Sequence, residues 1–450
     1  MGMRSTIDEP AAVATTADAG SEIEPAPADR EDDRGVNLSH GPTLLALPGP
    51  TMIPDVVLQA MQRPACDIYG GGELEQTTHS ILSDLKPLFR TVEARTYLYV
   101  ANGHGGWEAA ISNLFSAGDK VLVLASGRFA IGWGEMASAM GVEVEVLPSP
   151  PRGAVDPAAV EARLRADAGG AIKAVLTVQI DTASGVQNDL PSIRAALDAA
   201  GHGALFLVDG VASIGCTPFE MDAWGVDLAL TGSQKGLMTP PGLAPMAAGP
   251  RALEAHASAG LRTRYWDWTF RDGPEHYQKY CGTPPTHLLF GLRRSLDLLL
   301  VEEGLEAAWA RHRRLARSVR AAIDAWGQEG ALECAVLKPE QRSDTVTPVF
   351  TAEGLEAEAL RQLTAARCGV TLGLQIGDDA PRGRAFRIAH MGHVSAASVM
   401  GVLGATEAGM RALGWPIGEG GLSAAAAEMA AALGGHSAGD AASDRAACCD

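Results

Sequence analysis

The segments ALFLVDGVAS (204–213) and DLALTGSQKG (227–236) decide the fold, because each joins an apolar run to a polar turn that contains glycine. An apolar run buried on both faces is typical of a strand in a parallel sheet that lies between two layers of helices. Seven such runs alternate with helical stretches: 96–101, 121–126, 142–147, 174–180, 204–209, 227–232 and 244–249. This pattern predicts a doubly wound α/β domain with a mainly parallel, seven-stranded sheet.

The segments after this domain predict a second, smaller one. A long helical stretch covers 284–328, and short strands at 347–350 and 385–389 flank a helix at 353–366, which is the pattern of an α+β domain. We therefore expect four regions: a disordered acidic tail at 1–38, a large domain at 39–290, a small C-terminal domain at 291–413, and a flexible acidic tail at 414–450 with one candidate helix at 422–433.

The composition argues against several classes of protein. The 450 residues carry a net charge of −18, which repels nucleic-acid phosphates and anionic membranes. No apolar run reaches the ~20 residues of a transmembrane helix. The seven cysteines show no C-x-x-C spacing and the N-terminus lacks a secretory signal, so we expect a cytoplasmic protein without nucleic-acid or membrane partners. His390 and His393 have no carboxylate at a ligating offset, so we expect no metal.

The residues after each strand are the candidates for chemistry, because ligands of such sheets bind at the carboxyl ends of the strands. The turn Asn102-Gly103-His104-Gly105-Gly106 follows the first strand and opens a helix, where free backbone N–H groups can bind a phosphate. It lacks the G-x-G-x-x-G pattern of dinucleotide sites. A role for these glycines in packing alone is an equal alternative.

Asp209 and Lys235 follow two further strands. They could form a simple salt bridge. Desolvation at an apolar strand end, however, disfavours the charge of a lysine and makes its amine a better nucleophile. A carboxylate opposite a phosphate-binding turn can hold a proton on a pyridine nitrogen. A phosphate turn, a carboxylate and an amine together outline a pyridoxal phosphate site.

Seven segments carry a resemblance to a known family: LPGPTMIP (47–54), NGHGGWEAA (102–110), DTASGV (181–186), VDGVASIG (208–215), TGSQKGLMTPPG (231–242), YCGTPP (280–285) and FRIAHMG (386–392). Together they resemble the class V aminotransferases of fold type I, and within that family the alanine–glyoxylate and serine–glyoxylate aminotransferases. The resemblance extends from about residue 42 to residue 410.

The resemblance implies a homodimer in which each active site lies at the subunit interface. It assigns Lys235 to the covalent link with the cofactor, Asp209 to the pyridinium nitrogen and Arg387 to the substrate carboxylate, where bidentate geometry suits arginine. The other cofactor-binding residues that it implies are Asn102, Gly103, His104 and Gln234 as phosphate ligands, Tyr280 and Thr283 from the other subunit, Phe129 against the ring where relatives have tryptophan, and Thr182 on the substrate side.

We therefore expect a pyridoxal phosphate-dependent transaminase that moves the amino group of alanine or serine to glyoxylate or a similar 2-oxo acid. Two alternatives stay open. One is a transaminase of the same family that uses pyridoxamine or another unusual amine as donor, with pyruvate as acceptor. The other is a nonenzymatic α/β ligand-binding protein with a decayed site, for which a colourless purified protein would be evidence.

Overall fold

The large sheet has seven strands in the order β2-β8-β7-β6-β5-β3-β4. All neighbouring strands are parallel except the two pairs that contain β8, which confirms the predicted mainly parallel sheet. The computed structural model describes residues 36–68, 72–377 and 380–434. The strands are β2 (Arg95–Val100), β3 (Lys120–Ala125), β4 (Glu143–Pro148), β5 (Ile172–Val178), β6 (Leu205–Asp209), β7 (Leu228–Leu230) and β8 (Leu243–Ala248).

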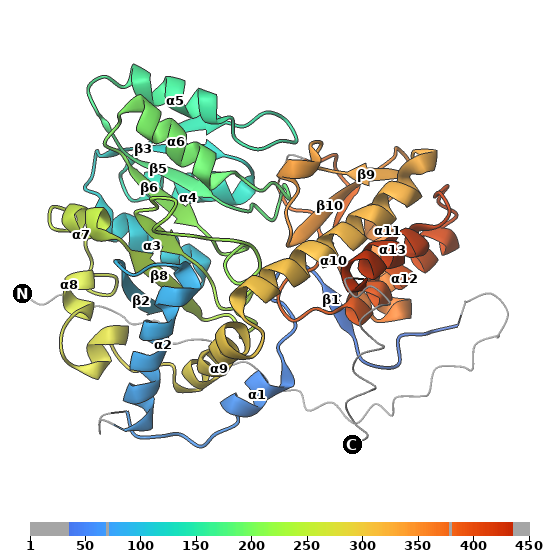
Figure 1. Ribbon diagram of the computed structural model, residues 1–450, viewed down its shortest axis with the longest axis horizontal. Coiled ribbons are helices and arrows are strands. Elements are labelled where there is room, and N and C mark those ends of the chain that lie inside the picture. The colour runs from blue at the N-terminus through green and yellow to red at the C-terminus, as the bar shows by residue number, and fades with distance from the viewer. Residues whose placement is uncertain (1–35, 69–71, 378–379, 435–450) are drawn as a thin grey trace, which may run out of the picture. The chain divides into compact units, whose positions relative to one another are not determined.

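Two layers of helices cover this sheet (Figure 1). Side chains of β6 alternate between two cores: Phe206 and Val208 belong to one, Leu205 and Leu207 to the other. The first core is shared with α2 (Glu73–Phe89), α5 (Pro157–Ala166), α6 (Leu190–Ala200) and α9 (Thr286–Asp297), on which α1 (Asp55–Met61) packs. The second is shared with α3 (Gly103–Leu114), α4 (Arg128–Ala139), α7 (Pro250–His256) and α8 (Trp268–Arg271).

Local sequence explains where helix α6 begins and ends. The Asp189 carboxylate accepts the backbone N–H of Ser192 at 3.2 Å and so caps the start of α6, and Pro191 suits the first turn, where no amide donor is needed. The helix ends at Gly201, whose φ of +62° is a left-handed conformation that glycine adopts without strain.

The smaller sheet has five strands in the order β1-β11-β12-β10-β9. Its strands are β1 (Leu44–Ala46), β9 (Leu332–Cys334), β10 (Val346–Thr351), β11 (Val370–Leu374) and β12 (Ala385–Ala389). It shares a core with α10 (Leu305–Trp326), α11 (Ala357–Cys368) and α12 (Ala396–Ala412), in which Trp326, Phe386 and Leu403 are buried. The prediction of a smaller α+β unit is confirmed at the level of these elements.

Two boundaries differ from those expected. Residues 44–46 lie in the predicted large domain, but β1 pairs in parallel with β11, so this segment is an edge strand of the smaller sheet. The predicted helical stretch 284–328 is interrupted by a π-helical turn at Leu298–Glu302 and by Gly304, whose φ is +83°, so α9 and α10 are separate helices.

The prediction of a flexible tail from residue 414 is wrong for residues 414–433. Helix α13 (Gly421–Leu433) packs against α10 and α12, and Ala425 is fully buried in their core. The Ala- and Gly-rich composition that resembles a linker provides the small side chains that such close helix packing needs. Residues 1–35 and 435–450 lie outside the described residues, so neither the N-terminal tail nor the rest of the C-terminal one can be compared.

Among the helices of the described ranges, none combines the length and apolar content needed to span a bilayer.

Candidate active site

A cavity of about 300 Å³ opens where strands β2, β5 and β6 end. Residues from the smaller sheet also line it, since Arg387 comes from β12 and the loop Pro48-Gly49-Pro50 follows β1. Nine of the eleven predicted site residues lie in its wall: Asn102, Gly103, His104, Phe129, Thr182, Asp209, Gln234, Lys235 and Arg387. The structure therefore brings together residues that are up to 285 positions apart, from Asn102 to Arg387 (387 − 102 = 285).

Lys235 is buried in this cavity, with 8% of its surface exposed. Its Nζ lies 3.5 Å from the Thr182 hydroxyl and 5.7 Å from the centre of the Phe129 ring. Burial lowers the pKa of Lys235 to about 8, and the charge of Arg387 adds to the decrease, while Asp209 and Asp181 oppose it. About a tenth of the amine is therefore neutral, and so nucleophilic, at pH 7, far more than for a lysine with an ordinary pKa.

Asp209 ends β6 and is also buried. One carboxylate oxygen, Oδ1, accepts the backbone N–H of Val211 at 2.6 Å, and the other, Oδ2, accepts the indole N–H of Trp107 at 2.7 Å. Burial raises the pKa of Asp209 to about 6, and both hydrogen bonds and the charge of Lys235 limit this rise. Each oxygen keeps a free lone pair with which the carboxylate can bind a cationic donor in the cavity.

Arg387 extends from β12 into the same cavity. Its Nε donates to the Leu374 carbonyl at 2.7 Å and its Nη1 donates to the Thr182 carbonyl at 2.8 Å. Burial lowers the pKa of Arg387 to about 10, and Asp181 opposes the decrease. Two acids close in the sequence with which Arg387 could form a salt bridge instead, Asp378 and Asp379, lie outside the described residues. The two neutral carbonyls orient the guanidinium and leave its charge available for an anionic ligand.

The glycine turn forms the start of α3, as predicted. The Asn102 side chain caps the helix by accepting the N–H of Gly105 at 3.2 Å. A Cβ at Gly103 would lie 2.9 Å from a methyl group of Val211, so only glycine fits there without displacement. The first amides of a helix have no partner within it, and here they border the cavity together with His104 and Gln234. This arrangement suits a phosphate.

Comparison with known proteins decides the family. The class-V aminotransferase family matches residues 43–380. The chain belongs to this family. It is 40% identical to the L-aspartate–glyoxylate aminotransferase of Paracoccus denitrificans, over 85% of this chain and 94% of that protein. It is 39% identical to the serine–glyoxylate aminotransferase of Methylorubrum extorquens, over 81% of this chain and 90% of that protein.

A solved structure supports the same fold and family. The pyridoxamine–pyruvate aminotransferase of Mesorhizobium loti superposes with a TM-score of 0.79 and 30% identity, over 87% of this chain and 98% of that one. The fold is thus that of the type I aminotransferases, and the cofactor of this class V aminotransferase is pyridoxal 5′-phosphate.

The residues present fit that cofactor. The side-chain oxygen of Gln234 is buried and has no hydrogen-bond partner within the described residues. A buried amide needs a partner, and rotation of this amide would present its N–H₂ group to a phosphate bound at the start of α3. Asp209 could hold the ring nitrogen, and Lys235 could provide the amine for the covalent link.

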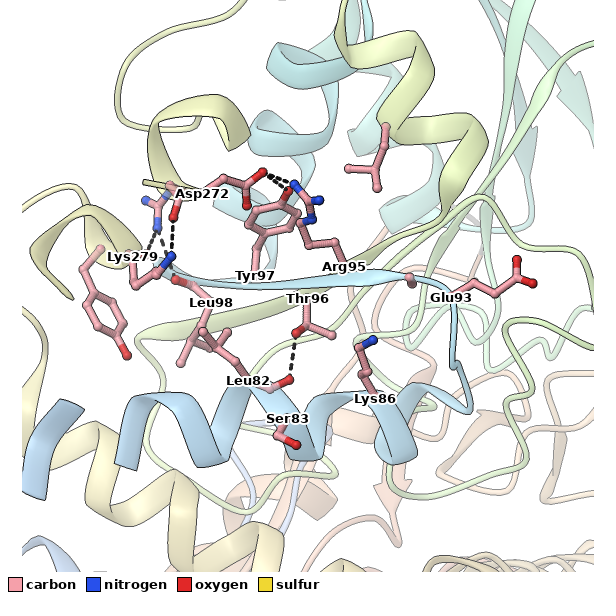
Figure 2. A pocket seen from close by; sticks show the side chains of 14 residues that line it. Leu82, Ser83, Lys86, Glu93, Arg95, Thr96, Tyr97, Leu98, Asp272 and Lys279 are labelled. Carbon is pink, nitrogen blue, oxygen red and sulfur yellow. Dashed lines mark hydrogen bonds and ion pairs between the residues drawn. The ribbon is translucent and has the colours of Figure 1, made fainter. Parts of the chain in front are cut away.

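Tyr280 and Thr283 do not line this cavity. Tyr280 is 2% exposed, and its hydroxyl lies 2.8 Å from that of Thr78. It lines a second cavity, of about 510 Å³, between α2 and β2 (Figure 2). Thr283 is exposed on the surface of the chain. Their contribution to the site of another subunit stays a prediction.

The second cavity lacks the features of a catalytic site. Arg95 forms an ion pair with Asp272 (Figure 2). The ammonium of Lys279 donates to the carbonyls of Arg271 and Gly273 at 3.0 and 2.9 Å. The Arg95–Asp272 pair thus holds the segment 271–280 against β2, and Lys279 joins the two ends of that segment. The smaller cavity, in contrast, contains the buried Lys235 and the N-terminus of α3.

Two residues of the site are missed from the sequence. Trp107 donates to Asp209, and Asp181 accepts the N–H groups of Phe129 and Ala130 at 2.8 and 3.1 Å, which fixes the start of α4 and with it the Phe129 ring. Both lie inside segments that carry the resemblance, NGHGGWEAA and DTASGV. The position of Asp181 directly after a strand is a signal that could have identified it.

Proposed function

We propose that this aminotransferase moves the amino group of alanine or serine to glyoxylate or a similar 2-oxo acid. The observation that carries the proposal is the single cavity in which the buried amine of Lys235, the Asp209 carboxylate and the Arg387 guanidinium meet. Pyridoxal phosphate, when bound, supplies an electron sink for the carbanion formed at the substrate α-carbon.

The cofactor would be held by three groups of residues. The helix start at Asn102, Gly103 and His104, with Gln234, would bind the phosphate, and Phe129 would pack against the ring. Asp209 would keep the ring nitrogen protonated, which makes the ring a stronger electron sink.

Lys235 would form the covalent link with the cofactor and, once displaced by the donor, would move the proton. Its lowered pKa of about 8 suits a base that takes a proton from the α-carbon and later returns it as an acid. The Thr182 hydroxyl, 3.5 Å from Nζ, would help to orient the free amine.

Arg387 would bind the α-carboxylate of the donor and then that of the acceptor. Among the described residues that line the cavity, it is the single arginine, and Lys235 is engaged with the cofactor. One guanidinium can hold one carboxylate, so the described wall favours a donor with a neutral side chain over a dicarboxylic one. The names of the relatives that act on glyoxylate support the acceptor.

The proposal includes a homodimer with shared sites, to which Tyr280 and Thr283 of the partner subunit contribute. It also places the enzyme in the cytoplasm. The five described cysteines carry free thiols, which is consistent with a reducing compartment.

A donor screen on the purified holoenzyme tests the proposal. Alanine, serine, aspartate and pyridoxamine are each mixed rapidly with the enzyme, and the change in cofactor absorbance is followed by stopped flow. We expect alanine or serine to react fastest, and glyoxylate to restore the original spectrum. Reaction with pyridoxamine alone, reversed by pyruvate, would establish the alternative donor, and a colourless protein that reacts with none would refute an enzymatic role.

A further inference from the structure

Trp107 makes a hydrogen bond that no role proposed above explains. It lies in the first turns of α3, is 2% exposed, and lines the cofactor cavity. Its indole N–H donates to Oδ2 of Asp209 at 2.7 Å. This bond links a neutral donor to the carboxylate that would hold the cofactor nitrogen.

The indole is held in place on two sides. The ring of Trp133 from α4 stacks on it with centroids 6.2 Å apart and an angle of 14° between the planes. The centre of the His104 ring lies 4.5 Å from that of the indole. The Trp107 ring therefore cannot turn without displacing its neighbours, so the direction of its N–H is fixed.

We propose that Trp107 is a positioning residue: it fixes the orientation of the Asp209 carboxylate and keeps it ionised, so that Asp209 can hold the proton on the cofactor nitrogen. The inference rests on the proposed role of Asp209. The two oxygens of Asp209 have one N–H donor each, the Val211 amide and the Trp107 indole, so loss of the indole N–H leaves one oxygen without a fixed donor.

The charges around Asp209 explain why this donor is needed. Burial raises the pKa of the carboxyl to about 6, the charge of Lys235 lowers it, and the charge of Asp181 raises it. His104, whose own pKa is lowered by burial, is largely neutral near pH 7 and gives little compensation. Without the indole N–H, the pKa of Asp209 would rise toward neutrality, and a protonated carboxyl cannot stabilise a protonated ring.

The test compares the affinity of the apoenzyme for two ligands. One is pyridoxal phosphate, and the other is its carbocyclic analogue in which C–H replaces the ring nitrogen. The variants are Trp107→Phe and, as a matched control, Trp133→Phe, whose indole nitrogen is buried without a hydrogen-bond partner within the described residues. Both variants remove one indole from the same aromatic stack, but only one removes the donor to Asp209.

We expect Trp107→Phe to raise the dissociation constant of pyridoxal phosphate about two- to tenfold at pH 7, the effect of raising the carboxyl pKa by roughly one to two units. The dissociation constant of the variant, divided by that of the wild type, should fall toward one as the pH rises to 9, because the Asp209 carboxyl then ionises without the indole N–H. His104, Lys235 and Asp181 titrate in both proteins, so their effects largely cancel in this ratio. The carbocyclic analogue should bind variant and wild type alike.

The inference would be overturned if Trp107→Phe lowered the affinity for both ligands equally, or lowered neither. It would also be overturned if Trp133→Phe lowered the affinity for pyridoxal phosphate but not for the analogue. If Trp107→Phe unfolds, the same measurement is made with 3-benzothienylalanine at position 107, in which sulfur replaces the N–H at nearly constant shape. Failure of the proposed function itself would look different: the wild-type protein would then show no preference for pyridoxal phosphate over the analogue.

Discussion

At the scale of single residues, Lys235 and Arg387 place two cationic groups in one buried cavity. Burial lowers the pKa of both, and the charge of Arg387 lowers that of Lys235 further. A carboxylate bound to Arg387 would offset this repulsion and so raise the pKa of Lys235. We therefore expect binding of the substrate carboxylate to make Lys235 a stronger base when the α-proton has to be removed.

Replacement of Arg387 by lysine tests the carboxylate clamp. The substitution keeps the charge but loses the planar fork of the guanidinium. The transition state should therefore lose about 2–4 kcal/mol of stabilisation, which lowers kcat/KM for alanine and serine. The loss should be absent for an amine donor without a carboxylate, while cofactor content and melting temperature change little. The measurement is kcat/KM for each donor in both proteins.

Arg384→Lys is the matched control, because Arg384 lies three residues away and donates to the Thr351 carbonyl, outside the cavity. An equal loss in Arg384→Lys, or an equal loss for the carboxylate-free amine, would contradict a clamp at Arg387.

The sequence predicts the polar residues of the site better than its aromatic ones. Asp209 and Lys235 are predictable because they follow apolar strands, where a charge is unexpected unless it is used. Trp107 follows no such rule. Trp107 lies in a largely buried helix, where an indole is expected to pack in the core. Only the structure shows that its N–H points at the Asp209 carboxylate at the end of β6.

At the scale of elements, six of the seven strands of the large sheet are predictable as mainly apolar runs with a turn behind them, whereas β4 alternates glutamate and valine and lies at the sheet edge with no buried residue. The three-residue strand β1 is not, since its partner β11 comes far later in the chain and no local pattern connects them. The helical state of α13 is predicted, as the candidate helix at 422–433, but its packing against α10 is not, because the segment has no amphipathic pattern that would indicate a buried face.

Gly421→Ala tests whether α13 is part of the folded domain. A Cβ at Gly421 would overlap the indole of Trp326, which is 1% exposed and held by a hydrogen bond from its Nε1 to Glu407 at 2.8 Å. We expect the free energy of unfolding to fall by about 1–3 kcal/mol, as overpacking in a core usually costs. A urea unfolding curve measures the change.

Ser423→Ala, on the exposed side of the same helix, is the control and should change stability by less than about 0.5 kcal/mol. If both variants unfold at the same urea concentration as the wild type, α13 does not pack as described.

At the scale of the whole molecule, the fold follows from the sequence but the complete site does not. Two segments that resemble the family, around Asn102 and Lys235, meet within one chain because β2 and β7, which precede them, end on the same side of the sheet. The segment with Tyr280 and Thr283 remains outside that cavity. In the proposed homodimer, this segment would reach the phosphate site of the partner subunit.

Mixed dimers test whether the segment with Thr283 acts in the site of the partner subunit. Lys235→Ala removes the amine that we propose to be catalytic. Thr283→Asp places a negative charge beside the phosphate if the segment acts in the partner's site, and the two negative charges would repel each other. Because Thr283 is exposed, the second variant should fold normally. Each homodimer should be nearly inactive. In a mixed dimer that shares its sites between subunits, one site combines wild-type Lys235 with wild-type Thr283 and the other carries both substitutions, so mixing should restore activity. The measurement is transaminase activity after subunit exchange, with exchange verified by differently tagged subunits. Exchange without recovery would mean that Thr283 acts within its own chain, because each site of a mixed dimer would then lack one required group. A fully active Thr283→Asp homodimer would mean that Thr283 contributes to neither site.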